Sequence, residues 1–496
     1  MAPSPDYTPE PRFPDLGDGF FDAVPAARFP ARTLRFRNQP WAARVGLGTL
    51  DADAWARHFW AFEPLPGNLP QPLALRYHGH QFQVYNPQLG DGRGFLFAQF
   101  RDPADGRLLD LGTKGSGQTP WSRGGDGRLT LKGGVREILA TEMLEALGVY
   151  TSKTFSLFET GEALERGDEP SPTRSSVMVR LSHGHVRFGS FQRHAYHRDP
   201  ERLRKLLELA AEIYVPEHAS TPGADLASRF LRAVSERSAR LAASWMVAGF
   251  VHGVLNTDNM NVTGESFDYG PWRFLPRYDP QFTAAYFDSM GLYAYGRQPA
   301  AVAWNVEQLA VALVPLSTTE ALEVAMESFE EVFRAEYRRR FLERLGVASR
   351  GDESDTSLLR ACLCFLGESY VGFDQFFFDW YGGVVSAERA LRGPAAGHYT
   401  GPRYEEFRAA LDRHAPSHPE RLEHAYFRVE KPCSMLIAEV ESIWDAIAQR
   451  DDWSPLEAKV AEIRAMGDVL GHAVAAHPAP TSAGAGVAPD LSASSA

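Results

Sequence analysis

The stretch HGVLNTDNMNVTGESFDYG, residues 252–270, places polar side chains in an order that suits phosphate and metal chemistry. Asn259 follows His252 by seven positions, and Asp268 opens the triplet Asp-Tyr-Gly. We predict a hairpin over residues 259–269, with a strand on each side of a turn at Gly264, which folds Asn259 and Asp268 toward each other. Their oxygens could then share one Mg²⁺ or Mn²⁺ that bridges phosphates. The alternative is a polar hairpin that Asn and Asp only cap.

The same order is typical of the catalytic loop of protein kinases, in which an aspartate two positions after the His takes the proton from the acceptor hydroxyl. Here that position is Val254, and an aliphatic side chain cannot accept a proton. Asp258 is the available carboxylate, and it would face a differently placed phosphorus of the same nucleotide. A conventional kinase is therefore disfavoured, whereas a silent ATP-binding protein stays open.

Short alternating segments precede this stretch and helical periodicity follows it. We predict strands at 73–79, 80–86, 95–100, 107–115, 154–162 and 175–182, with a helix over 135–147 that stops at Gly148. We predict helices over 200–215, 224–253, 302–313, 318–345, 356–380, 403–413, 434–449 and 454–466.

This order favours an α+β, protein-kinase-like fold of two lobes, with a small β-rich N-lobe and a large helical C-lobe. We expect an N-terminal extension packed on the body over 1–60, the N-lobe over 61–190 and the helical C-lobe over 191–472. The segment 473–496 is rich in Ala, Ser, Pro and Gly and is predicted to be disordered.

A glycine-rich turn, LGDGRG at 89–94, lies between two of the predicted strands, where backbone amides can approach phosphate oxygens. Gly90 and Gly92 alone are more typical of an ordinary hairpin turn. Lys114 in the next strand and Glu137 on the following helix strengthen the case, because a strand lysine held by a helix carboxylate positions a cation against nucleotide phosphates. Arg180 and Arg187 are further phosphate candidates, although arginines at such positions also form structural ion pairs.

Composition limits the classes of function. The net charge of -12, without a basic run, argues against a nucleic-acid partner. We find neither a long uncharged apolar run nor a signal peptide, so we expect a cytoplasmic protein without a membrane partner.

A longer set of motifs resembles the selenoprotein O family, protein adenylyltransferases with a pseudokinase fold. The resemblance covers about residues 35–300 and rests on these segments, in chain order: RYHGHQF, LGDGRG, DLGTKGSGQTPWSRGGDGRLTLKGGVREIL, RLSHGHVRFG, HGVLNTDNM and DYGP with YDP.

The resemblance implies transfer of AMP from ATP, bound in a flipped orientation, to Ser, Thr or Tyr hydroxyls of proteins. It implies that Asp258 accepts the proton and that Asn259 and Asp268 hold Mg²⁺ or Mn²⁺. The implied nucleotide-binding residues are Gly90, Gly92, Arg93, Lys114 with Glu137, Asp126, Gly127, Arg180, Arg187 and Asp268. We expect a monomer. Transfer of UMP with Mn²⁺ and a catalytically silent ATP-binding scaffold stay open as alternatives.

Overall fold

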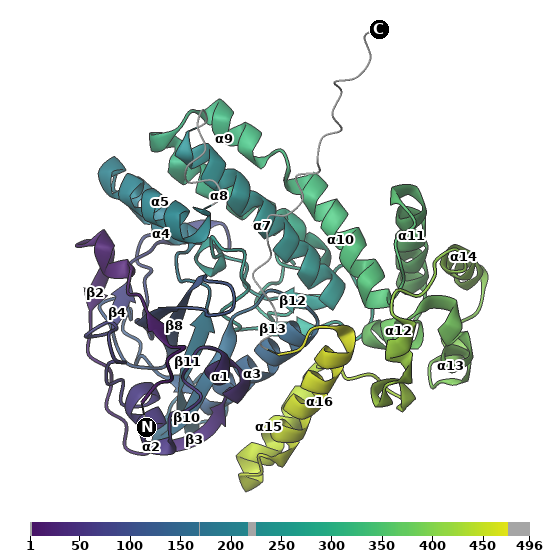
Figure 1. Cartoon of the computed structure of the whole chain (residues 1–496), viewed down its shortest axis with the longest axis horizontal. Helices are drawn as coiled ribbons and strands as arrows, with labels where there is room; N and C mark the ends of the chain where they lie inside the picture. Colours follow the sequence, from purple (N-terminus) through teal and green to yellow (C-terminus); the bar gives the residue numbers. More distant parts are fainter. Residues whose placement is uncertain (1, 168, 217–224, 475–496) are drawn as a thin grey trace.

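The computed structural model of the protein describes residues 2–167, 169–216 and 225–474. Its described part is mixed α/β: an antiparallel sheet forms one half of the molecule, and helices form most of the other (Figure 1). The nine strands of the sheet are β1 (Thr8–Pro9), β2 (Phe21–Ala23), β3 (Thr33–Arg37), β4 (Leu73–Leu75), β7 (Leu96–Arg101), β8 (Leu108–Lys114), β9 (Leu129–Thr130), β10 (Lys153–Leu164) and β11 (Thr173–Ser182). Their order is β2-β4-β7-β8-β11-β10-β3, with β1 beside β7 and β9 beside β11.

The first 60 residues are part of this sheet. Strand β1 pairs with β7, β2 with β4 and β3 with β10. The short helices α1 (Gln39–Arg44) and α2 (Ala52–Phe59) follow, each capped by the side chain of the preceding Asn38 or Asp51. The segment that we expected to lie over the body therefore supplies three strands to it.

Both faces of the sheet are buried, as the alternation along β11 illustrates. Val177 and Val179 pack into one core with residues of α1 and α2, whereas Met178 between them packs into a second core with α3 (Leu131–Ala146). Successive side chains of a strand point to opposite faces, so one strand contributes to two cores. The second core continues into the helical half.

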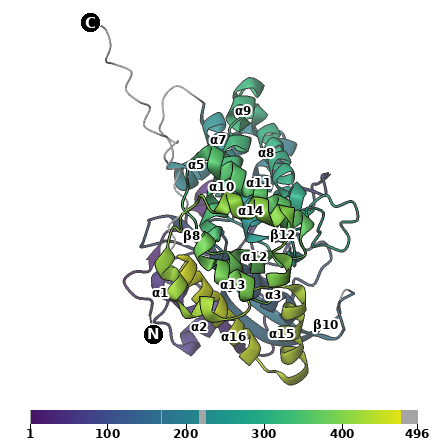
Figure 2. The same ribbon diagram turned by 90° about the vertical axis from the view of Figure 1, so that its right-hand side faces the viewer.

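The helical half begins after β11 and ends beside the sheet. Its helices are α4 (Phe188–Tyr196), α5 (Pro200–Tyr214), α7 (Leu226–Ala248), α8 (Gln298–Leu313), α9 (Thr319–Met326), α10 (Phe329–Leu345), α11 (Asp352–Glu368), α12 (Phe373–Asp379), α13 (Ala387–Arg392), α14 (Pro402–Leu411), α15 (Ile437–Arg450) and α16 (Ser454–Leu470). Helices α15 and α16 return to pack against α3, as Figure 2 shows. The predicted disordered tail lies, from residue 475 on, outside the described residues.

The predicted hairpin over 259–269 is wrong. Asn261 pairs with Arg187, just before α4, and Ser266 pairs with Thr151, just before β10, so the segment forms isolated bridges to other parts of the chain and not two strands paired with each other. The two ends of the polar segment are instead held together by β12 (Phe250–His252), which pairs with β13 (Trp272–Phe274). The turn at Gly264 is present, with φ of 71° and a hydrogen bond to the Asn261 carbonyl.

Other predicted boundaries also need correction. Residues 79–86 form a hairpin of β5 (Gly79–Gln81) and β6 (Val84–Asn86) and not one strand, because Phe82 and Gln83 take positive φ values and turn the chain. The helices predicted over 318–345 and 356–380 are each divided in two, and the long helix predicted over 224–253 stops at the left-handed Gly249. Helix α4 was not predicted.

One helical stretch, Tyr295–Leu316, has the length and the mean hydropathy, 1.3, of a membrane span. Its main part is α8, whose Val302, Val306, Leu309 and Leu313 are buried in the core that α3 and α7 share. We interpret this stretch, found among the described residues, as a core helix, although the sequence pattern had indicated no stretch of this length and hydropathy.

Candidate active site

A cavity of about 720 Å³ lies where the sheet meets the loop 252–270. It is lined by the glycine-rich turn 90–94, the loop 121–128, strand residues of β8 and β11, and the polar loop. The predicted site residues that line it are Gly90, Gly92, Arg93, Lys114, Asp126, Gly127, Arg180, Arg187, Asp258, Asn259 and Asp268. Glu137, the remaining predicted residue, lies behind Lys114 and contacts it. The structure thus brings together side chains that are spread over 179 sequence positions, from 90 to 268.

Lys114 connects the sheet, α3 and the polar loop. Its Nζ atom lies 2.5 Å from Oε1 of Glu137 and 2.8 Å from Oδ1 of Asp268. Glu137 is only 1 % exposed, and Lys114 is the cation that contacts it. The predicted contact between the lysine and the glutamate is present, and the partly exposed Asp268 adds a second carboxylate to the same lysine.

Asp268 is held as an anion by the cations around it. Burial raises the pKa of its carboxyl, but Lys114, Arg180 and Arg187 outweigh burial and hold the pKa well below its usual value. Its backbone has a φ of 64°, which an aspartate tolerates better than most residues. A fixed, ionised carboxylate of this kind can bind a divalent cation.

The two arginines leave N–H groups unused at the cavity. Among the described residues, Nε and Nη1 of Arg180 have no hydrogen-bond partner, nor does Nε of Arg187, and all three atoms are buried. Arg180 lies 3.7 Å from Asp268, while Arg187 donates to the Asp258 carbonyl at 2.8 Å and lies over the rings of Tyr77 and Phe267. Buried guanidinium donors without partners are costly unless an anion satisfies them. The arginines therefore indicate a site for phosphate groups.

The glycine positions of the glycine-rich turn have no room for a side chain. A Cβ on Gly90 would lie 2.4 Å from Cγ of Trp121, and one on Gly94 would lie 2.1 Å from the Thr113 carbonyl oxygen. The turn thus packs directly on the loop 121–128 and on β8. Asp126, in that loop, forms an ion pair of 2.8 Å with Arg166, which also lines the cavity.

Asp258 lies on a 3-10 turn, Thr257–Asn259, and is 8 % exposed. Burial raises the pKa of its carboxyl to about 6, although Arg187 opposes the shift. Its Oδ1 atom has no hydrogen-bond partner among the described residues. The side chain of Thr257 anchors the turn, since it accepts from the His80 amide at 2.7 Å. Asp258 is thus a buried carboxylate that lines the cavity and has a proton affinity suited to a base.

The residues present fit a divalent cation, with the nucleotide supplying further ligands. Asn259 donates its amide nitrogen to the Val254 carbonyl at 3.0 Å, which leaves its amide oxygen for a cation. Within the described ranges, no group of three or more His, Cys, Asp or Glu residues forms a ready metal site. A cation here would therefore need phosphate oxygens beside Asn259 and Asp268, as Mg²⁺ sites of this kind usually have.

Sequence reasoning missed two residues that organise the site. Asp91 accepts from the Leu75 amide at 3.0 Å and lies 3.4 Å from Nη2 of Arg187, so it holds that arginine in place. Asn256 lines the cavity and accepts from the Phe82 amide and the Tyr293 hydroxyl, both at 3.0 Å. Asp91 stands between two of the predicted glycines, and that position was the available signal.

Known proteins resemble this chain over most of its length. Residues 5–464 match the family described as "Protein adenylyltransferase SelO". The chain belongs to this family. A protein of Gloeobacter violaceus named "Protein nucleotidyltransferase YdiU" is 44 % identical over 466 residues, which are 92 % of this chain and 94 % of the relative. Its namesake in Synechocystis sp. is 44 % identical over 475 residues, 92 % of this chain and 98 % of that protein.

Family membership supports the resemblance drawn from the motifs and extends it beyond the stretch 35–300. A further namesake, from Cereibacter sphaeroides, is 40 % identical over 347 residues, or 69 % of this chain and 71 % of that protein. The matched family range includes α15 and most of α16, which return to the sheet half. The C-terminal helices are thus part of what the family shares.

Proposed function

We propose that the protein is a protein adenylyltransferase, which transfers AMP from ATP to Ser, Thr or Tyr hydroxyls of other proteins. The family description and the names of the relatives support a protein nucleotidyltransferase. The observation that carries the proposal is the pair of buried arginines with unpaired N–H groups beside Lys114, because a polyphosphate is the ligand that such a cation cluster fits.

We further propose a protein-kinase-like arrangement of two lobes, with ATP bound between them in the flipped orientation. The glycine-rich turn and Lys114 belong to the sheet half, whereas Asp258 and Asn259 belong to the polar loop. Residues of both parts therefore line the cavity. Val254 lines the cavity where a kinase has its base, and Asp258 is the carboxylate nearby in sequence that lines the same cavity. Reaction at the α-phosphorus next to Asp258 is consistent with this displacement.

The proposed reaction is a single displacement. Asp258 takes the proton of the acceptor hydroxyl, whose oxygen forms a bond to the α-phosphorus while the bond between that phosphorus and the oxygen bridging to the β-phosphorus breaks. Pyrophosphate leaves with the bond electrons, and AMP stays on the acceptor. Arg180, Arg187 and Lys114 neutralise charge on the phosphates. A Mg²⁺ or Mn²⁺ ion held by Asn259 and Asp268 would supply further neutralisation.

Transfer of UMP from UTP is the second candidate, since the names of the relatives say nucleotidyltransferase and do not say which nucleotide is transferred. The groups that bind phosphate and metal would serve either nucleotide. A silent ATP-binding scaffold is disfavoured, because Asp258, Asn259 and Asp268 line the same cavity as the cations Lys114, Arg180 and Arg187, which supports a catalytic role.

Labelled nucleotides test the proposal. We expect label on protein from ATP labelled at the α-phosphate and none from ATP labelled at the γ-phosphate. Label from the γ position would show a kinase, and label from neither would show a scaffold. The same assay with α-labelled UTP shows whether AMP or UMP is transferred faster. Repeating it with Mg²⁺ and with Mn²⁺ shows which ion supports the reaction better.

Two substitutions assign the roles of the carboxylates. Asp268→Ala should abolish transfer, because it removes the residue that would hold the metal against the phosphates. Asp258→Asn should slow transfer by roughly 10²- to 10⁴-fold, the usual contribution of a general base. Melting curves would show whether each variant is folded. Full activity of the Asp268 variant would refute the metal assignment.

We also propose that the protein acts in the cytoplasm as a monomer, with proteins and a nucleotide as its partners and without nucleic acid or membrane. Its acidic net charge of -12 supports the exclusion of nucleic acid. Light scattering of the purified protein would test the monomer.

A further inference from the structure

Large apolar side chains are unusually exposed at one place in the described part of the chain. Tyr286 is 88 % exposed, Met290 82 % and Val84 70 %, and these are three of the four most exposed large apolar side chains there. Phe287, at 49 %, lies beside Tyr286. Single exposed apolar residues need no explanation, but a group of them usually marks a binding surface.

Two segments meet to form this surface. Phe82, in the turn of the β5–β6 hairpin, packs on Phe287 with ring centroids 5.8 Å apart and on Tyr293 at 4.9 Å. The hairpin turn and the segment 286–293 therefore lie against each other, and the exposed apolar side chains stand on these two neighbouring segments. We call Val84, Tyr286, Phe287 and Met290 the apolar rim patch.

The apolar rim patch continues into the mouth of the nucleotide cavity. Phe82 donates its amide to Oδ1 of Asn256, and the Tyr293 hydroxyl donates to the same oxygen, each at 3.0 Å. Asn256 lines the cavity two residues before Asp258. Gln81, which also lines the cavity, is the register partner of Val84. The patch is thus built on the groups that border Asp258.

The segment that carries the patch is fixed by polar contacts. Asp288, which is buried, accepts from the amides of Leu292 at 2.8 Å and Tyr293 at 2.9 Å. Arg297 donates to the carbonyls of Met290 at 3.0 Å and Gly291 at 3.1 Å. Tyr286 and Met290 consequently lie on a braced loop, which lowers the entropy cost of binding a partner there.

We propose that the apolar rim patch docks the acceptor protein by holding an apolar side chain of the segment that carries the acceptor hydroxyl. This inference rests on the proposed transfer to proteins. The cavity itself is lined mainly by charged groups and glycines that suit a nucleotide, so it offers little for an acceptor chain. Gln81 and Asn256 line the same cavity as Asp258, and the two segments that carry the apolar rim patch are attached to these residues.

The test compares paired variants in a labelling assay. Full-length wild type, Tyr286→Ala/Met290→Ala and the control Val311→Ala/Val324→Ala are each incubated with α-labelled ATP and a bacterial protein extract freed of nucleotides. The control removes two exposed apolar side chains from α8 and α9, away from the rim. ATP affinity of each protein is measured separately, and light scattering reports the oligomeric state.

We expect the patch variant to label extract proteins roughly tenfold or more slowly, as loss of two interface anchors would predict. Its ATP affinity should stay within about twofold of wild type, since neither residue lines the cavity. The control should label at the wild-type rate. Mapped acceptor sites should carry an apolar residue close to the modified hydroxyl.

Three outcomes would overturn the docking role. Equal labelling by the patch variant and wild type would do so directly. A wild-type dimer that the patch variant converts to a monomer, with labelling unchanged, would assign the patch to a second copy of the chain. Absence of α-label on any protein with wild type would overturn the proposed function itself, and the docking role with it.

Discussion

At the scale of single residues, the site is a set of charges that depend on one another. Lys114 contacts Glu137 and Asp268 together, and Arg187 is placed between Asp91 and the backbone of Asp258. Each buried charge is tolerated because a partner of opposite sign lies beside it. Removal of one partner should therefore affect both stability and chemistry.

Lys114→Met should lower the free energy of unfolding by about 3–5 kcal/mol, because it leaves Glu137 charged and buried without its cation. The double variant Lys114→Met/Glu137→Gln should regain much of that stability but no transfer activity, since the phosphate-binding cation is still missing. Urea unfolding and α-labelling measure the two effects. A single variant as stable as wild type would show that Glu137 does not depend on the lysine.

At the scale of elements, the polar loop is shaped by its attachment to the sheet. Glu265, between the two proposed metal ligands in sequence, accepts from the His183 amide at 2.8 Å and is only 4 % exposed. Burial raises the pKa of Glu265 to about 7, although Lys153 and Arg107 oppose the shift. The folded protein thus binds this proton more tightly than the unfolded chain does.

The contribution of Glu265 to stability should be present below its unfolded pKa and fall as the pH rises toward about 7, the pKa in the folded state. Glu265→Gln stays neutral and keeps an acceptor for the His183 amide. We therefore expect its melting temperature to rise relative to wild type between pH 5 and 8, by an amount equivalent to roughly 1–3 kcal/mol. Glu430→Gln, at an exposed position, is the control. A difference in melting temperature between Glu265→Gln and wild type that stays constant from pH 5 to 8 would contradict the raised pKa of Glu265.

Element boundaries also show what could be predicted from the sequence. Strand β8 was predicted to within one residue at each end, whereas α3 begins four residues before the predicted start because it is buried on most sides. The hairpin predicted at 259–269 failed because Asn261 and Ser266 pair with residues distant in sequence, which local patterns do not reveal. The types and order of the charged residues allowed us to group those that line one cavity, whereas Asn256 acts through contacts that only the fold creates.

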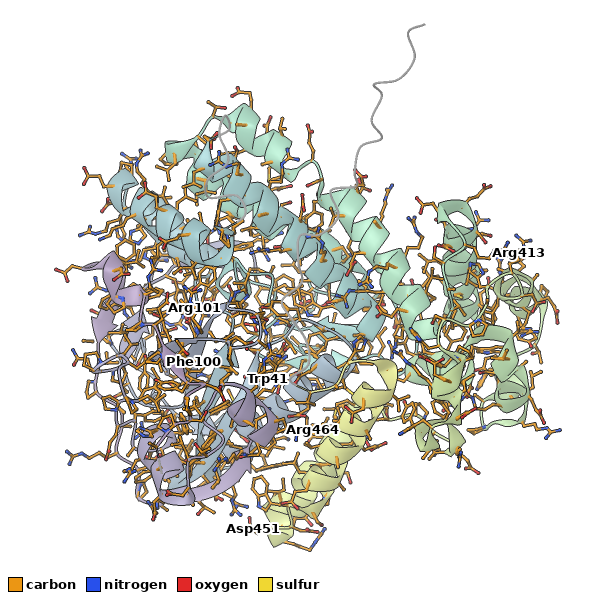
Figure 3. The ribbon with its side chains drawn as sticks, viewed as in Figure 1. Trp41, Phe100, Arg101, Arg413, Asp451 and Arg464 are labelled. Carbon is orange, nitrogen blue, oxygen red and sulfur yellow. The ribbon has the colours of Figure 1, made fainter. Side chains whose placement is uncertain are left out.

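At the scale of the whole molecule, the C-terminal helices fasten the helical half to the sheet half. Arg464 on α16, labelled in Figure 3, binds both oxygens of Glu142 on α3 at 2.7 Å. Asp451, just after α15, forms ion pairs with Arg35 of β3 at 3.0 Å and Arg174 of β11 at 2.7 Å. The last helices therefore support α3, which carries Glu137, and β11, which pairs with the strand β8 that carries Lys114.

Arg464→Met should lower the free energy of unfolding by about 2–4 kcal/mol, because Glu142 is 2 % exposed and would lose its main cation. Addition of Glu142→Gln should restore part of the loss. Arg392→Met, which breaks an exposed pair with Glu388, should change stability by less than about 1 kcal/mol. Thermal or urea unfolding of the four proteins measures these differences. Equal effects of the Arg464 and Arg392 variants would contradict the proposed fastening.

The proposed AMP transfer depends on how the nucleotide lies in the cavity, and a structure with a non-hydrolysable ATP analogue and Mg²⁺ measures this directly. We predict the α-phosphate beside Asp258, with Arg180, Arg187 and Lys114 on the phosphates and the metal held by Asn259 and Asp268. An analogue with its γ-phosphate beside Asp258 and its α-phosphate remote from it would contradict the proposed transfer.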